Sequence, residues 1–173
     1  MYGVVIFIGL LLILAVCQDF KTYQVSNKIF LTGIMGSLIY QLVSCSVVGI
    51  ASWITGMGVL FIIGLPVWAL GMFGAGDVKL IMMIGSCFGV AFAIKVSFYA
   101  LCIGAVFSIG KMLYVGNLTR RLQFLCNYIS CIFIHKRIIS YGTSGALEKD
   151  KIIHFSLPIA LGYLWLYLDM NLF

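Results

Sequence analysis

The chain has 173 residues, of which 63% are hydrophobic and 9% are charged, and its mean hydropathy is +1.15. Soluble domains are about 45–50% apolar and about 25% charged, so a soluble core of this size would lack the polar surface it needs. The same composition excludes a disordered chain. An integral membrane protein remains. At about 20 residues per span, the length predicts an all-α polytopic protein with about six transmembrane helices, in one membrane-embedded domain over residues 1–173.

The charge balance is basic, with 11 Lys and Arg against 5 Asp and Glu and a formal net charge of +6. In a soluble protein this balance would suggest nucleic-acid binding. Here the basic residues lie between apolar segments, where membrane topology and lipid headgroups account for them. We therefore expect membrane lipids as partners, and no nucleic acid.

Apolar runs follow one another along the chain with short polar connections. The predicted spans are residues 2–18, 29–50, 51–73, 80–94, 96–110 and 152–168. No charge occurs between residues 29 and 76, so we expect a short turn near residues 44–52 to separate the second span from the third. Lys95 is expected to separate the fourth span from the fifth.

The Lys and Arg residues predict the orientation of these spans. With the N-terminus outside, the cytoplasmic connections hold ten of them and the outer connections hold only Lys95. This bias favours both termini outside, and it places Asp19 and Asp77 at the cytoplasmic end of the bundle. Residues 122–134 are mainly apolar between two basic pairs, which favours an amphipathic helix in the membrane plane of a cytoplasmic loop over a seventh span.

Asp19 and Asp77 are the acidic residues that need an explanation. Each directly adjoins a long apolar run, whereas Glu148 and Asp150 lie among lysines in the long loop and Asp169 lies near the C-terminus. Ionisable groups at membrane depth cost about 2.5–3.5 kcal/mol on insertion scales, so a function is the default hypothesis. Either aspartate alone could be an ordinary helix-end residue, or could pair with Lys21 or Lys79. Together on one membrane face, they suggest a pair of carboxyl groups.

Paired carboxyl groups suit peptide hydrolysis. Two of them about 3 Å apart cannot both ionise, so they share one proton and their pKa values separate. The ionised member can take a proton from water while the protonated member polarises a peptide carbonyl, without metal or covalent intermediate. His135 and His154 lie in or beside the long loop with no matching His/Glu cluster, so we expect no metal site and no cofactor.

The sequence G-A-G-D-V-K at residues 74–79 adds a geometric argument. Gly74 and Gly76 allow the backbone to approach another chain closely and to adopt positive φ. An extended substrate could therefore lie against this backbone while Asp77 points at its carbonyl group. Lys79 could favour the ionisation of Asp77 or bind a lipid phosphate.

At these motifs the chain resembles the type IV prepilin peptidase family of membrane aspartyl peptidases. Residues 74–79 match the family's G-x-G-D-x-K motif throughout. Asp19 and the V-S-N-K sequence at residues 25–28 resemble the first-aspartate motif, which typically ends in Ile-Pro-Asn. Val and Ser replace Ile and Pro here, which favours a looser turn after Asp19. The H-F-S-L-P sequence at residues 154–158, with Gly162, resembles the family's last span.

The resemblance implies cleavage of the short basic leader of prepilin-like proteins, after a glycine, at the cytoplasmic face of the plasma membrane. It implies Asp19 and Asp77 as the catalytic pair. The family motifs fall on four further candidate residues: Gly74, Gly76, Lys79 and Asn27. Larger relatives carry a cytoplasmic domain with paired cysteines and also N-methylate the product. This chain lacks that domain, and so resembles the short peptidase-only form of tight-adherence (Flp-type) pili or archaeal preflagellin peptidases.

Three other readings remain open at this point. Asp19 and Asp77 could relay protons or bind a cation in a small transporter, although such sites usually lie near the midplane on broken helices. The chain could be an intramembrane protease of presenilin type, which shares G-x-G-D but normally has more helices and places its aspartates inside spans. It could also be a non-catalytic assembly protein.

Overall fold

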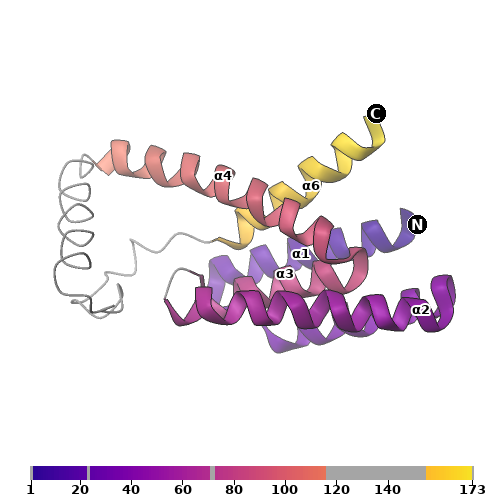
Figure 1. Cartoon of the computed structure of the whole chain (residues 1–173). Helices are drawn as coiled ribbons and strands as arrows, with labels where there is room; N and C mark the ends of the chain where they lie inside the picture. The colour runs from indigo at the N-terminus through magenta and orange to yellow at the C-terminus, as the bar shows by residue number, and fades with distance from the viewer. Residues whose placement is uncertain (1, 23, 71–72, 116–154, 173) are drawn as a thin grey trace. The chain divides into compact units, whose positions relative to one another are not determined.

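The computed structural model describes residues 2–22, 24–70, 73–115 and 155–172. Helices account for the regular structure of these residues: α1 (Tyr2–Thr22), α2 (Asn27–Ala69), α3 (Ala75–Phe88), α4 (Val90–Val115) and α6 (Ser156–Leu172) (Figure 1). The predicted all-α class is confirmed. The chain divides into two units, residues 1–103 with 154–173 and residues 104–153, and every contact discussed below lies within the first. The predicted single domain stays a prediction, and the proposed loop helix at 122–134 lies outside the described residues.

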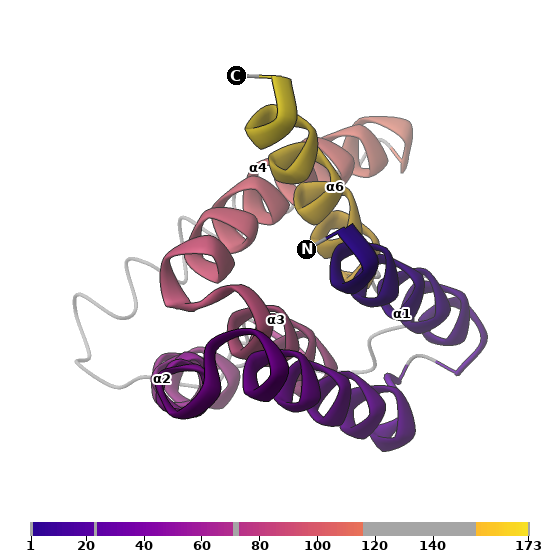
Figure 2. The same ribbon diagram turned by 90° about the vertical axis from the view of Figure 1, so that its right-hand side faces the viewer.

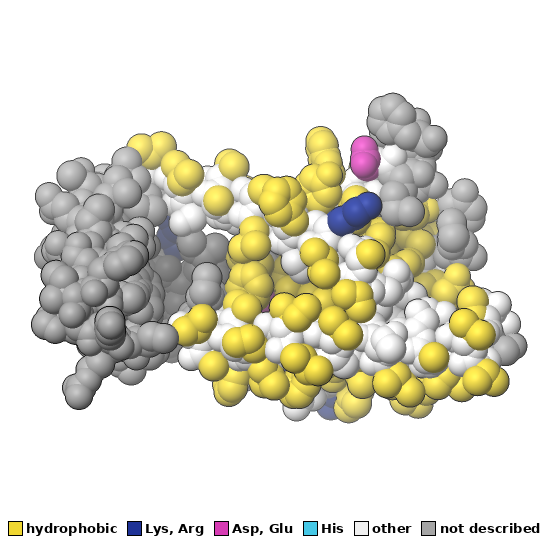
Figure 3. All heavy atoms as spheres, viewed as in Figure 1, with side chains coloured by type: hydrophobic (Ala, Val, Ile, Leu, Met, Phe, Trp, Pro, Cys, Tyr) yellow, Lys and Arg dark blue, Asp and Glu magenta, His cyan; other side chains and the backbone are white. Residues whose placement is uncertain are grey.

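Among the described residues, four segments are long and apolar enough to cross a membrane: Gly3–Thr22, Asn27–Cys45, Val47–Ala69 and Val90–Lys111. Large hydrophobic side chains on these segments point outward, and Val43 is 82% exposed and Ile62 69% exposed. Figure 3 shows hydrophobic side chains spread along the helices with few charged groups among them. Such a surface requires lipid as its solvent, so the chain is a multi-pass membrane protein.

The helix α2 is not straight but folds back on itself. The Trp53 indole Nε1 donates to the carbonyl oxygen of Ile34 at 3.3 Å and to the Ser37 hydroxyl at 3.0 Å. In a straight helix, residues this far apart in sequence would be separated by roughly 24 Å or more. Gly49 packs directly against the carbonyl oxygen of Gln41, which places the reversal between these two residues. Figure 1 shows it at the labelled end of α2. The turn predicted near residues 44–52 is therefore confirmed.

The boundary predicted at Lys95 is wrong. The helices α3 and α4 are separated at Gly89, whose φ of +86° lies in the left-handed region that glycine enters without a Cβ clash. The helix α4 then continues through Lys95, whose side chain is exposed. A lysine can stay in a membrane helix because its long apolar stem carries the ammonium to a polar boundary. With 14 residues, α3 is about 21 Å long, shorter than the four long segments.

The short α3 is held against both arms of α2, Asn27–Cys45 and Val47–Ala69, as Figure 2 shows. Glycines make these contacts close: Gly33 of the first arm lies against Met83, and Gly56 of the second lies against the backbone of Gly85. Small residues are the usual means of close helix packing in lipid, where no hydrophobic effect drives helices together.

A buried polar cluster fixes the far end of α3. The hydroxyl groups of Ser37 and Ser86 are 2.9 Å apart, and the Gln41 side-chain Nε2 donates to the carbonyl oxygen of Cys87 at 2.9 Å. The second bond satisfies one of the carbonyl groups that a helix end leaves without a partner. The C-terminal end of α3 is held in this way, and its first turn lies at the opposite end of the bundle.

The last helix, α6, closes the bundle against α1 and α4. The Tyr163 hydroxyl donates to the carbonyl oxygen of Val5 at 3.0 Å. Gly162 lies so near the backbone of α4 that an added Cβ would stand 3.0 Å from the carbonyl oxygen of Val96. The C-terminal helix is thereby brought beside the first, with its N-terminal end near the C-terminal end of α1. Its start at Ser156 falls inside the predicted span 152–168, of which residues 152–154 lie outside the described part of the chain.

Candidate active site

Asp19 lies in the last turn of α1 and is partly buried. Its carboxylate Oδ2 accepts a hydrogen bond of 2.6 Å from the hydroxyl of Ser156, the first residue of α6. Ser156 is fully buried. The C-terminal helix therefore contributes directly to the surroundings of the first predicted catalytic residue, across 137 positions of sequence.

Asp77 lies in the first turn of α3, before its apolar run, and is also partly buried. Its carboxylate Oδ2 accepts a hydrogen bond of 3.1 Å from the backbone N–H of Gly74, the N-cap of the helix. Burial raises the pKa of Asp77 from 3.8 to about 6; the hydrogen bond from Gly74 opposes this rise, and the negative charge of Asp19 adds to it. The two aspartates are thus close enough for the charge of one to act on the other.

Asn27 and Lys79 are brought together as well. The Lys79 ammonium donates to the side-chain Oδ1 of Asn27 at 2.7 Å. This bond joins the first residue of α2 to the first turns of α3, and so connects the two aspartate motifs. Neither role considered for Lys79 from the sequence includes this partner. The structure places the ammonium on Asn27, and its charge is not among the causes of the Asp77 pKa shift.

The positive φ expected at Gly74 and Gly76 is wrong. Gly74 has φ −70° and ψ 151°, and Gly76 lies within α3. Gly76 instead allows a close approach within the chain, because a Cβ there would stand 2.9 Å from Cγ2 of Val25. The sequence showed that close packing was possible at this glycine, but it could not show that the partner is the chain itself.

Hydrogen bonds order the described residues just before α2, where a looser turn was expected. The Ser26 side chain caps α2 by accepting from the backbone N–H of Lys28 at 3.2 Å, and the Ser26 backbone N–H donates to the Gln18 side chain at 3.2 Å. Serine is a favoured N-cap, so Ser26, which stands where the family motif typically has proline, orders the start of α2 by capping it. Gln18, Val25 and Ser156 all contribute to the site. Val25 and Ser156 lie in the motifs at residues 25–28 and 154–158, but none of the three was predicted as a site residue. For Ser26, the signal was a serine three residues before the predicted span 29–50.

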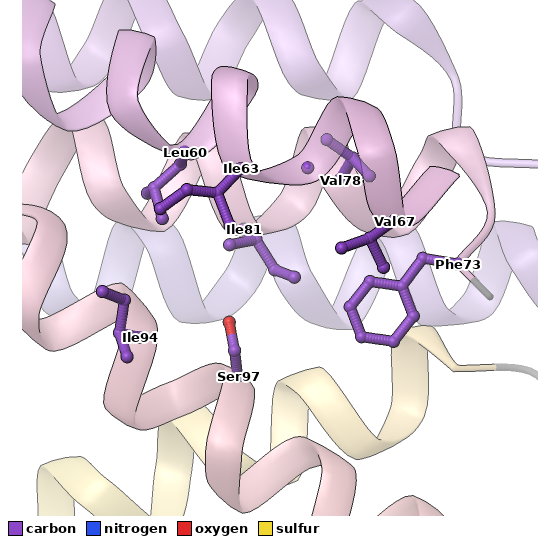
Figure 4. Close-up of a pocket in the computed structure, with 9 residues that line it drawn as sticks. Leu60, Ile63, Val67, Phe73, Val78, Ile81, Ile94 and Ser97 are labelled. Carbon is purple, nitrogen blue, oxygen red and sulfur yellow. The ribbon is translucent and has the colours of Figure 1, made fainter. Parts of the chain in front are cut away.

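An apolar pocket of about 170 Å³ lies beside the start of α3 (Figure 4). Its wall includes Val78, which follows Asp77, and Phe73, whose ring packs on that of Phe155 with centroids 4.9 Å apart. The other side chains that Figure 4 labels come from the second arm of α2, from α3 and from α4: Leu60, Ile63, Val67, Ile81, Ile94 and Ser97. An apolar cavity thus lies next to residues that directly adjoin Asp77 and Ser156 in sequence.

Residues 5–109, more than half of the chain, match the model of the type IV leader peptidase family. The chain belongs to this family. The match includes both Asp19 and Asp77, and it confirms the resemblance on which the sequence interpretation depends. The chain is therefore a multi-pass membrane protein of a protease family. Comparison with curated proteins and with solved structures gave no match.

Proposed function

We propose that this protein is an aspartyl endopeptidase that cleaves the basic leader of prepilin-like precursors, of the Flp pilin or archaellin-like kind. Asp19 and Asp77 are its catalytic pair. The observation that carries this proposal is the proximity of the two carboxyl groups: burial raises the pKa of Asp77 to about 6, and the negative charge of the nearby Asp19 adds to this rise. They come from different helices: Asp19 lies in the last turn of α1 and Asp77 in the first turn of α3.

The reaction needs one proton shared between two carboxyl groups. The ionised group accepts a proton from water as the water oxygen attacks the scissile carbonyl carbon, and the protonated group donates to the carbonyl oxygen. When the tetrahedral intermediate breaks, the C–N bond is cleaved, the nitrogen of the leaving segment takes up the proton from the first group, and the proton on the former carbonyl oxygen returns to the second group. The two groups together thus supply acid and base in both steps.

The proposed topology has six spans with both termini outside, and α3 and α6 are the two short ones. The last turn of α1 and the first turn of α3, which carry the aspartates, then lie on the cytoplasmic side, where most Lys and Arg residues accumulate. A substrate leader rich in Lys or Arg stays on the same side by the same bias, while the apolar helix that follows enters the bilayer. The scissile bond is held at headgroup level, near Asp19 and Asp77.

The test is cleavage of a precursor peptide by the purified full-length chain in liposomes. The peptide contains a short basic leader, a glycine and an apolar helix. We expect the wild type to cut after the glycine, and Asp19→Ala and Asp77→Ala each to abolish cleavage. The double variant should be no worse than either, because the two groups act as a unit. Asp169→Ala removes an exposed carboxylate of α6 and should keep full activity. Retained activity in either single variant of the pair would exclude the mechanism.

A further inference from the structure

We propose that Ser156 is a positioning residue that holds Asp19 as the ionised member of the pair, so that Asp19 acts as the base and Asp77 as the acid. This inference rests on the proposed function. It divides the two roles between the aspartates, and it makes the C-terminal helix α6 part of the active site. Ser156 lies outside residues 5–109, the part of the chain that matches the family model.

The first argument is the length and direction of the hydrogen bond. The Ser156 hydroxyl donates to Oδ2 of Asp19 at 2.6 Å. Bonds from a hydroxyl to an ionised oxygen are about 2.5–2.7 Å long, shorter than those between neutral groups. A hydroxyl that donates to a carboxylate stabilises its charged form. Because Ser156 is fully buried, its hydroxyl is held in place rather than exchanged with solvent.

The second argument is the position of Ser156 as the first residue of α6. The N-terminal end of a helix carries a partial positive charge from its aligned peptide dipoles, which favours a neighbouring anion. This field and the Ser156 hydroxyl therefore act on Asp19 in the same direction.

The third argument is the contrast with Asp77. Asp77 also lies at a helix N-terminus and accepts a hydrogen bond from the backbone N–H of Gly74. Burial outweighs both effects and raises the pKa of Asp77 to about 6, so this group keeps its proton to a higher pH than an ordinary carboxyl group. With a charged Asp19 beside it, Asp77 is the group that gains stability by holding the proton.

Among the described residues, the other charged groups at this end of the bundle do not reverse the assignment. Lys79 of α3 bonds to Asn27, and the side chains of Lys21 of α1 and Lys28 of α2 are exposed. Exposed cations are screened by solvent and salt, and any residual field from them favours ionised carboxylates.

The kinetic test uses Ser156→Ala and its partial restoration, Ser156→Thr, in the precursor cleavage assay across pH. Loss of one hydrogen bond to a charged group predicts a ten- to hundredfold lower kcat near neutral pH, with KM within about twofold. The acidic limb of the kcat profile should move to higher pH, because the charged form of the base has lost a hydrogen-bond donor. Thr keeps the hydroxyl and should restore most of kcat and the position of that limb.

The matched control is Thr55→Val, which removes a hydroxyl that bonds only the carbonyl groups of its own helix, those of Ala51 and Ser52. Its pH profile should coincide with that of the wild type. An unshifted acidic limb in Ser156→Ala, or an equal loss in the Ala and Thr variants, would overturn the proposal while leaving the proposed function intact.

A spectroscopic measurement keeps the test independent of cleavage and of how well Ser156→Ala folds. The infrared band of protonated carboxyl groups is recorded at pH 6 for the wild type in liposomes, for Asp19→Asn and for Asp77→Asn. We expect the wild type to show this band, Asp77→Asn to lose it, and Asp19→Asn still to show it. A band that vanishes only in Asp19→Asn would overturn the assignment. Absence of cleavage by the wild type, with the band assigned to Asp77, would reject the proposed function and leave the proton assignment standing.

Discussion

At the scale of single residues, Gly74 and Gly76 belong to one motif but have different structural roles. A Cβ on Gly74 would stand 3.1 Å from the Asp77 carboxylate oxygen, so its absence leaves room for the bond that caps α3. The absence of a Cβ on Gly76 lets Val25 pack against the first turn of α3. Both glycines therefore position Asp77, one through its hydrogen bond and the other through the packing of its helix.

The first prediction concerns this contact between Gly76 and Val25. Gly76→Ala should lower cleavage tenfold or more, because its Cβ would stand 2.9 Å from Cγ2 of a stiff β-branched side chain. Gly76→Ala combined with Val25→Ala should recover much of the activity, since the second change removes the obstacle. Gly58→Ala is the control, because nothing lies within 4 Å of that position. If the double variant stays as inactive as Gly76→Ala, the absence of a Cβ at residue 76 makes room for the substrate rather than for Val25.

The second prediction follows from the raised pKa of Asp77. The folded state binds this proton more tightly than the unfolded state, so its contribution to stability is present at low pH and is lost as pH rises from 3.8 through about 6. Asp77→Asn removes the buried charge while an amide can still cap α3. It should therefore raise the free energy of unfolding at pH 8 by at most about 3 kcal/mol, and the thermal midpoint with it. Both quantities should change little at pH 4. Thermal unfolding in detergent at both pH values measures this. An equal effect at the two pH values would contradict the burial of the charge.

The same group predicts the basic limb of the cleavage profile. If Asp77 acts as the acid, kcat should fall as pH rises through about 6, the pKa that burial and the charge of Asp19 impose on it. The profile is measured with the full-length chain in liposomes at saturating precursor. A rate that keeps rising to pH 9 would show that the protonated form of Asp77 is not needed.

At the scale of the helices, the site depends on how α2 and α3 are joined. The arms of α2 hold the body of α3, and the bond between Asn27 and Lys79 joins their first turns next to the aspartates. The apolar runs predicted most of these helices, and the absence of charge over residues 29–76 predicted the reversal of α2. The break at Gly89 was not predicted, because a charge within an apolar run resembles a boundary more than one glycine among 19 does.

The third prediction tests the bond between these helices. Lys79→Ala and Asn27→Ala should each lower cleavage by a few fold, as expected for about 1 kcal/mol from one exposed hydrogen bond. Their effects should not add in the double variant, because each change already removes the shared bond. Lys28→Ala removes a neighbouring exposed cation and serves as the control. Additive losses would indicate that Lys79 acts elsewhere, on Asp77 or on lipid phosphate.

At the scale of the whole molecule, the site collects residues from both ends of the sequence. The family motifs predicted Asp19, Asp77 and the segments around them, because their chemistry is local in sequence. Ser156 was not predicted as their partner, since a contact across 137 positions depends on how α6 packs against α1 and α4. Close packing at Gly162 and the bond from Tyr163 to Val5 set this arrangement. Gly162 belongs to the motif of the last span, but the motif does not show which helices pack against it.

The last prediction concerns the orientation of the chain in the membrane. The reversal of α2 and the segments around Asp19 and Asp77 lie at opposite ends of the α2 arms, so they should be accessible from opposite sides. In a background without the six natural cysteines, a membrane-impermeant maleimide should label Ser46→Cys on intact cells. Gln24→Cys, an exposed position before α2, should be labelled only in inverted vesicles or after permeabilisation.

The physical reason is the charge distribution. Lysines flank both aspartate segments, and moving them across the membrane is opposed by the bias that keeps Lys and Arg in the cytoplasm. Gly145→Cys in the long basic loop should follow Gln24→Cys. Labelling of Gln24→Cys on intact cells would place Asp19 and Asp77 outside, on the side opposite to a leader that basic residues retain in the cytoplasm. Cleavage of such a leader would then require another route of substrate entry.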